Sequence, residues 1–304
     1  MTERREKPAP KGVSAYGFSE DQLLSTPLVF RDDLLAGKTV LVSGAGSGFG
    51  KAMAVVFARL GADVFICGRK QEKLDRTADL ISGLGRQVGT MSMTIREPDE
   101  VEALLDAVYD RFGRLDVQIN NAGGQFAQAA IDFAPKGWRA VIDTNLNGTW
   151  YMMQAAAKRW RDAGREQAEG ASIVNIAAAV TRGIPHMAHT AAARAGVITL
   201  SKSVALEWAP LGIRVNCLGV GTCESSGFEN YSDEGRKSFY GSNPMRTVGD
   251  VWDVAEAAVY LAAPSGKFIT GETLTIDGGQ QMWGDYWAAG QPDYFRHDYL
   301  DGQD

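Results

Sequence analysis

The chain has 304 residues and a net charge of −6, from 31 Lys and Arg against 37 Asp and Glu. This balance argues against a nucleic-acid partner, which would need a basic face. No apolar run approaches the ~18 residues of a membrane span, and the charged, Pro-containing start is not a secretory signal. The three cysteines form no C-x-x-C pair, which favours a reducing, cytoplasmic compartment over a disulfide framework.

Alternating strand and helix patterns begin at Gly37. Short β-branched and apolar runs predict seven strands, at 38–42, 63–67, 87–93, 115–119, 172–176, 213–217 and 272–276. Helical patterns lie between them, at 51–60, 70–82, from Pro98 onward, 137–160, 188–208 and 250–262. This order predicts one doubly wound α/β domain with a seven-stranded parallel sheet over 37–280. Residues 1–36 and 281–304 are then an N-terminal extension and an aromatic, acidic C-terminal extension.

A glycine-rich turn, Ser43-Gly44-Ala45-Gly46-Ser47-Gly48-Phe49-Gly50, directly follows the first predicted strand. The backbone N–H groups of such a turn, together with the start of the next helix, can cradle a pyrophosphate. Glycine is required because a Cβ would push the phosphate away or collide with the sheet. The motif indicates a dinucleotide site, and a tight turn in a generic α/β domain is the alternative.

The end of the second strand decides which dinucleotide fits. An NAD site places Asp or Glu there for the ribose hydroxyls, but this chain reads Cys67-Gly68-Arg69-Lys70. Arg69 can pair with a 2′-phosphate through a charge-assisted hydrogen bond, so we expect NADPH as the cofactor. The alternative interpretation of Arg69 is a solvated cation at a helix start.

Further motifs follow in order: Asn120-Asn121-Ala122-Gly123, Asn145, Ala195-Gly196-Val197 and Asp277-Gly278-Gly279. Together with the glycine turn, they resemble the short-chain dehydrogenase/reductase family over about 37–280. The resemblance implies a single Rossmann domain, a nicotinamide cofactor and usually a homotetramer, and the small apolar residues of the predicted helix 188–208 suit close helix packing. It implies cofactor contacts at Ser43, Gly44, Ser47, Gly48, Phe49, Gly50, Thr94, Ile95, Asn121, Ala122, Gly123, Arg194, Val220 and Thr222.

The catalytic positions depart from the family pattern of Asn, Ser, Tyr and Lys. The Tyr-x-x-x-Lys pair reads Thr190 and Arg194, the serine position reads Ala177 or Ala178, and only Asn145 remains. A Thr hydroxyl is too weak an acid to protonate an alkoxide unaided, and Arg stays protonated and cannot relay protons.

Reduction of an α,β-unsaturated thioester is less demanding at the oxygen. Hydride adds to Cβ, and negative charge builds on the thioester oxygen, which needs preorganised hydrogen-bond donors. Thr190, Gln125 and Asn145 supply such groups, and Arg194 can hold the nicotinamide ribose.

Two histidines, His186 and His189, lie just before Thr190. We interpret them as loop residues at the mouth of the site that can pass a proton near neutral pH, and a purely structural role is the alternative. No cysteines or carboxylates accompany them, so we expect no metal site. The segment 222–246 falls at the carboxyl edge of the sheet and is a candidate substrate lid.

Gly123-Gly124-Gln125-Phe126, residues 189–197 and Ala205-Leu206-Glu207-Trp208-Ala209 resemble the peroxisomal trans-2-enoyl-CoA reductases and, more distantly, the 2,4-dienoyl-CoA reductases. The resemblance implies NADPH-dependent reduction of the C2=C3 bond of a trans-2-enoyl-CoA-type thioester. The tyrosine of the dienoyl-CoA branch is absent, with Ala179 and Val180 nearby, and no Ser-Lys-Leu-type signal supports peroxisomal import. Two alternatives stay open: a carbonyl reductase or hydroxyacyl dehydrogenase with a non-standard proton donor, and a catalytically silent cofactor-binding homologue.

Overall fold

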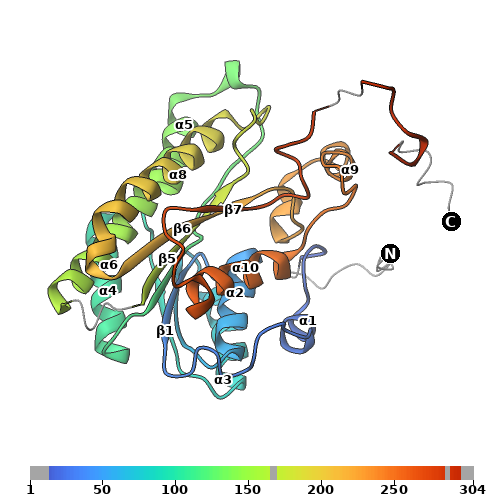
Figure 1. Cartoon of the computed structure of the whole chain (residues 1–304). Coiled ribbons are helices and arrows are strands. Elements are labelled where there is room, and N and C mark those ends of the chain that lie inside the picture. The colour runs from blue at the N-terminus through green and yellow to red at the C-terminus, as the bar shows by residue number, and fades with distance from the viewer. Residues whose placement is uncertain (1–13, 165–169, 285–287, 296–304) are drawn as a thin grey trace.

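The structure is a computed structural model that describes residues 14–164, 170–284 and 288–295. Its centre is a seven-stranded sheet with the order β3-β2-β1-β4-β5-β6-β7, in which every pairing is parallel (Figure 1). The strands are β1 (Thr39–Ser43), β2 (Asp63–Gly68), β3 (Val88–Ser92), β4 (Val117–Asn120), β5 (Ala171–Ala178), β6 (Ile213–Val220) and β7 (Thr273–Ile276). The parallel sheet predicted from the sequence is confirmed.

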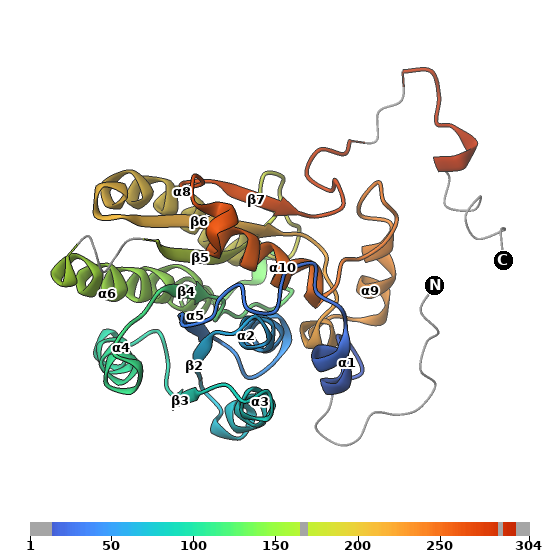
Figure 2. The same cartoon turned by 60° about the horizontal axis from the view of Figure 1, so that its bottom comes forward.

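Helices cover both faces of the sheet. In the described residues they are α1 (Glu20–Ser25), α2 (Gly48–Arg59), α3 (Gln71–Gly83), α4 (Pro98–Phe112), α5 (Pro135–Ile142), α6 (Gly148–Ala163), α8 (Ala188–Trp208), α9 (Asp233–Tyr240) and α10 (Val251–Ala262). Figure 2 shows α4, α6 and α8 on one face and α2, α3 and α10 on the other, each over its own cluster of buried apolar side chains. None of these helices is long and apolar enough to cross a membrane.

The central strands of the sheet read as largely apolar runs because both of their faces are covered. All five residues of β1 are buried, and β6 is buried at every position except Arg214. A strand covered on both faces needs no polar side, so its sequence does not alternate. Since all strands are parallel, their carboxyl ends meet at one edge of the sheet, where ligands bind in open α/β folds.

The helix predicted at 137–160 is present, as a continuous helical run over 135–163, but it is not α-helical throughout. A π-helical turn, η2 (Asp143–Asn147), separates α5 from α6. At this turn the Asn145 side chain bonds to both backbone groups of Gly124, in the connection after β4. A single widened turn of this kind is frequent at functional sites.

Part of the N-terminal segment 1–36 packs onto the domain. Leu23 of α1 and Leu35 are buried in the apolar cluster formed by α2 and α10. The Phe18 ring stacks on Trp252 of α10, with ring centroids 5.3 Å apart. These residues of the segment therefore share the core of the α/β domain.

The segment 222–246 folds into a 3-10 turn, η4 (Ser226–Asn230), followed by α9. The Phe239 ring on α9 meets Phe228 and Tyr231 edge-to-face, with ring centroids 5.2 Å apart in both pairs. Figure 1 shows α9 beside the chain that follows β7. The segment thus has an aromatic cluster of its own at the carboxyl edge of the sheet.

Candidate active site

Two glycines hold the turn between β1 and α2 close to the end of β4. Gly44 has a φ of 69°, and a Cβ there would lie 2.8 Å from the Cα of Ala122. A Cβ on Gly50 would collide with the Gly44 carbonyl oxygen and the Asn121 side-chain amide. A larger residue at either position would push the start of α2 away from the sheet.

The start of α2 is suited to an anion. Its first turn has unpaired N–H groups, as at every helix start, and it contains no acidic residue. The hydroxyl of Ser47, at the N-cap, makes no capping hydrogen bond. These N–H groups and the positive end of the helix dipole favour a phosphate, so Ser47, Gly48 and Phe49 fit the expected pyrophosphate cradle.

Ser43 and Asn121 brace this cradle from below. The Ser43 Oγ accepts hydrogen bonds from the backbone N–H groups of Asn121 (3.1 Å) and Ala122 (3.0 Å). The Asn121 Nδ2 donates to the carbonyl oxygens of Ser43 (3.0 Å) and Gly44 (3.2 Å). Both side chains are thus engaged in shaping the turn.

Arg69 follows the last residue of β2, which ends level with β1 because Cys67 is in register with Ser43. Its side chain is exposed, and the hydrogen bond found at Arg69 goes from Ser92 Oγ to its backbone carbonyl (3.3 Å). The guanidinium has no partner among the described residues, which leaves it available to a 2′-phosphate.

Thr94 and Ile95 follow β3. The Thr94 N–H donates to Glu100 Oε2 (2.8 Å), and Ile95 is buried so close to Gly148 that a Cβ there would lie 2.7 Å from Ile95 Cγ1. Ile95 therefore packs against the start of α6, and the contact of both residues with adenine stays a prediction.

Asn145 is fully buried and links three parts of the site. Its Oδ1 accepts from the Gly124 N–H (2.9 Å), and its Nδ2 donates to the Gly124 carbonyl oxygen (3.0 Å) and to Thr190 Oγ1 (3.4 Å). Because its amide hydrogens are used inside the protein, Asn145 acts as a positioning residue rather than a free donor.

Thr190 and Arg194 lie one turn apart on α8, on the same face. Thr190 is 2% exposed, and its hydroxyl oxygen accepts the Asn145 bond, so its own O–H is free to donate. The Arg194 guanidinium lies against Gly123, where a Cβ would collide with it.

The Nη1 of Arg194 is buried without a hydrogen-bond partner. Burial lowers the pKa of Arg194 to about 10, so the side chain remains a cation at neutral pH. A buried unpaired donor is costly, and the hydroxyls of a nucleotide ribose would satisfy it. Together with the glycine cradle, this orphaned group means that the residues present fit a dinucleotide.

His189 lies in the first turn of α8 and is fully buried, not in a loop at the mouth of the site as expected. Its ring stacks on Phe133 and meets Phe126 edge-on, and its Nδ1 accepts the Thr190 N–H (2.7 Å). Burial lowers the pKa of His189, more than the carbonyls of nearby residues raise it. The imidazole is therefore neutral at pH 7, which does not favour proton transfer to solvent. His186 is exposed in the loop before α8.

Tyr231, which the sequence interpretation did not place among the catalytic residues, lies next to Gln125. The Gln125 Nε2 donates to the Tyr231 hydroxyl oxygen (2.6 Å), which leaves the phenolic hydrogen free to donate. Burial raises the pKa of Tyr231, and the bond from Gln125 opposes that rise. The two residues are 106 positions apart, so no local pattern could have paired them.

The remaining expected positions lie at the ends of β5 and β6. Ala177 and Ala178 are in register with Gly219 and Val220, so no hydroxyl stands at the serine position. Val220 is buried, and the Thr222 carbonyl oxygen accepts the N–H of Gly249 (3.0 Å). In the ranges that the structure describes, no three His, Cys, Asp or Glu side chains are grouped to hold a metal.

The chain is similar to known proteins over most of its length. Residues 44–281 match the family model described as Enoyl-(Acyl carrier protein) reductase. A probable 2,4-dienoyl-CoA reductase of Bacillus subtilis is 37% identical over 250 residues, 81% of this chain and 97% of that protein. A peroxisomal 2,4-dienoyl-CoA reductase of Arabidopsis thaliana is 34% identical over 84% of this chain and 87% of its own length. The crystal structure of a short chain dehydrogenase from Bacillus anthracis superimposes with a TM-score of 0.76 and 35% identity, covering 83% of this chain and 99% of that one.

Proposed function

Because this chain belongs to the short-chain dehydrogenase/reductase family, we propose that it is an NADPH-dependent reductase of the C2=C3 bond of trans-2-enoyl-CoA-type thioesters. The observation that carries the proposal is the site around Thr190, where a buried hydroxyl and a buried arginine replace the usual acid and lysine. Thr190 and Arg194 can stabilise negative charge on an oxygen, but neither can protonate an alkoxide as the usual pair does.

The chain's own groups divide the work of binding. Ser47, Gly48 and Phe49 would hold the pyrophosphate, Arg69 the 2′-phosphate, and Arg194 the ribose beside the reacting ring. When bound, the nicotinamide cofactor supplies the hydride for the β-carbon of the thioester. The exposed guanidinium of Arg69 and the absence of an acid at 67–70 support NADPH over NADH.

Thr190 donates its hydroxyl hydrogen to the thioester oxygen as negative charge develops there. Asn145 fixes the hydroxyl by its bond to Thr190 Oγ1 and fixes the facing loop by its two bonds to Gly124. The Arg194 cation lies behind Gly123 and lowers the energy of the same negative charge. The reaction therefore needs no proton on the oxygen itself.

The α-carbon needs a proton after hydride addition, and we assign it to the Tyr231 phenol. Gln125 donates to the phenol oxygen, which orients the hydroxyl and stabilises the phenolate that proton transfer creates. Gln125 is thus a positioning residue for Tyr231. It follows Gly124, which Asn145 bonds, so the phenol belongs to the same loop cluster as Thr190.

We propose that the enzyme is a homotetramer of the cytoplasm. Leu206 at the end of α8 is 80% exposed and Phe268 is 99% exposed, and such apolar side chains suit a subunit interface. The three cysteines are free and buried, as expected in a reducing compartment. Light scattering tests the tetramer, and a monomer mass at micromolar concentration would refute it.

The test of the reaction is cofactor oxidation with three thioesters of equal chain length: trans-2-enoyl-CoA, 2,4-dienoyl-CoA and 3-ketoacyl-CoA. We expect the highest kcat/KM with trans-2-enoyl-CoA, and in D2O we expect deuterium at the α-carbon of the product. A preference for the dienoyl thioester would make this chain a functional match of its named relatives. Activity on the ketone alone would overturn the proposal, and no activity on any substrate would indicate a silent homologue.

A further inference from the structure

A pocket at the carboxyl edge of the sheet is lined by hydrogen-bond donors. It is open and has a volume of about 420 Å³, and it is lined by Arg182, Ser242, Arg246, Trp283 and Gln291. These residues come from three separate parts of the chain: the connection before α8, the connection after α9, and the segment after β7. None of the five carries a negative charge, although the whole chain is acidic.

Two lining residues carry a donor atom that is buried and unsatisfied: the Nε of Arg246 and the Nε1 of Trp283. The Arg246 guanidinium lies 5.0 Å from the Trp283 ring centroid and 4.7 Å from that of Phe295, and its Nη2 donates to the Phe295 carbonyl oxygen (3.1 Å). Arg182 donates to the Trp283 carbonyl oxygen. Two arginines and an indole N–H are thus held together without an acceptor for every donor, which favours an anionic ligand.

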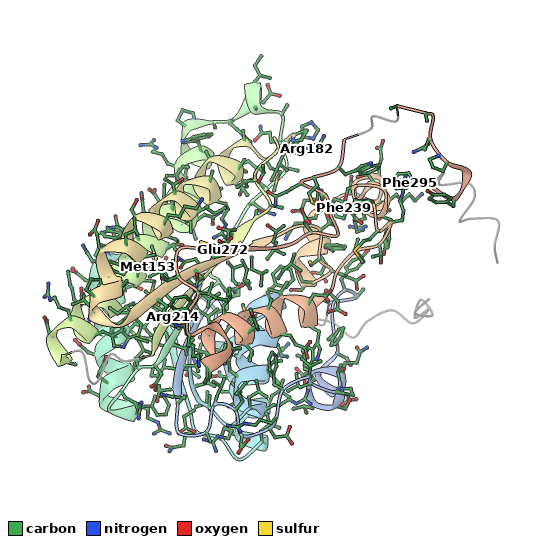
Figure 3. The ribbon with its side chains drawn as sticks, viewed as in Figure 1. Met153, Arg182, Arg214, Phe239, Glu272 and Phe295 are labelled. Atoms are coloured by element: carbon green, nitrogen blue, oxygen red, sulfur yellow. The ribbon has the colours of Figure 1, made fainter. Side chains whose placement is uncertain are left out.

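The pocket is connected to the candidate active site by direct contacts. The Ser242 N–H donates to the Phe239 carbonyl oxygen (3.1 Å), the Phe239 ring packs on Tyr231, and Tyr231 accepts from Gln125. On the other side, the Thr181 N–H donates to Gln281 Oε1 (2.9 Å), which ties the segment after β7 to the connection before α8. In Figure 3, Arg182 and Phe239 lie at the same end of the molecule as that segment.

We propose that this pocket binds the phosphate-bearing nucleotide of a coenzyme A thioester, an inference that rests on the proposed function. An arginine fork matches phosphate oxygens, and an indole offers both a donor and a flat face for a base. A volume near 420 Å³ is within the range of small-ligand pockets. A thioester carried by a short thiol without phosphate would gain nothing from these groups.

The test compares two thioesters with the same trans-2-enoyl group, one on coenzyme A and one on N-acetylcysteamine, which lacks phosphate and base. Arg182→Gln removes a pocket cation whose bond in the described residues is to a backbone carbonyl. We expect its KM for the coenzyme A thioester to rise about tenfold, with no comparable rise for the N-acetylcysteamine thioester. Trp283→Phe keeps a ring beside Arg246 but removes the unpaired N–H. We expect a smaller rise in the KM for the coenzyme A thioester, again with no comparable rise for the N-acetylcysteamine thioester.

The matched control is Arg111→Gln, which removes one exposed arginine from the end of α4, at the opposite edge of the sheet. It is expected to leave both KM values unchanged. Equal effects of Arg182→Gln on the two thioesters, or no effect on either, would overturn the proposal.

Titration of free coenzyme A, followed by tryptophan fluorescence, separates this inference from the reaction itself. If the wild-type chain reduces neither thioester, the proposed function fails. A Kd for free coenzyme A that is about tenfold weaker in Arg182→Gln than in wild type would still support the pocket. An unchanged Kd would overturn it.

Discussion

Removing the hydroxyl of Thr190 is the sharpest test of the oxygen site. Thr190→Val keeps the shape of the side chain, which is 2% exposed, and removes only the donor. The hydrogen bond that the hydroxyl accepts from Asn145 is long, at 3.4 Å, and the Asn145 Nδ2 keeps its bond to Gly124. The loss of folding stability is therefore expected to stay at or below about 1 kcal/mol.

The loss of turnover should be much larger. A donor to a developing oxyanion contributes roughly 3 kcal/mol, so kcat for trans-2-enoyl-CoA should fall about 10²–10³-fold. Steady-state kinetics with folding checked by thermal denaturation measures both quantities, and Thr190→Ser should keep most of the turnover. Thr199→Val, an exposed change on the same helix, should alter neither. Unchanged turnover in Thr190→Val would remove Thr190 from the mechanism.

Arg69→Ala should weaken NADPH binding about 10–100-fold in a fluorescence titration and leave NADH binding unchanged, and equal wild-type affinities for the two would contradict this. Tyr231→Phe should keep the packing on Phe239 and lower enoyl turnover by about 10²-fold or more, and a normal kcat would remove the phenol as the acid. Because the pKa of His189 is lowered in the folded protein, its neutral ring contributes to the free energy of unfolding. This contribution is fully present above pH ~6.5 and is lost as the pH falls through the pKa of the folded state. In denaturant titrations, the free energy of unfolding of His189→Phe should therefore fall less steeply with decreasing pH. If the free energy of unfolding depends on pH as steeply as in wild type, the buried neutral imidazole is contradicted. Burial raises the pKa of all three cysteine thiols to about 11 or about 12, so a disulfide reagent at neutral pH should label them only after unfolding.

The central strands could be predicted because β1, β2, β4, β5 and β6 are mostly buried and read as largely apolar runs. The π-helical turn at η2 could not be predicted, since Asp143–Asn147 contains nothing that marks a change of helix type. It depends on the bonds between Asn145 and Gly124, which lie 21 positions apart. Likewise, the glycines of the turn were predictable from their spacing, but the collisions that require them involve Asn121 and Ala122 of another strand end.

The catalytic groups were harder to predict than the cofactor cradle. His189 resembled a proton carrier because it adjoins Thr190 in sequence, yet Phe126 and Phe133 enclose its ring. Tyr231 lies in the candidate lid 222–246, and its partner Gln125 lies 106 positions away in the connection after β4, so the sequence gives no sign of their contact. Side chains that meet only through the fold leave no periodic signal in the chain.

The position of β1 in the sheet has a consequence for how the chain is made. On one side β1 pairs with β2, where Thr39 is in register with Asp63. On the other side it pairs with β4, which comes much later in the chain, and there Val40 is in register with Val117. During synthesis β1 is therefore an edge strand until β4 has left the ribosome, and parallel pairing offers no hairpin that could form early. An apolar, unpaired strand edge promotes association between nascent chains. The yield of folded protein in a cell should thus depend on how quickly residues 44–117 follow β1 out of the ribosome.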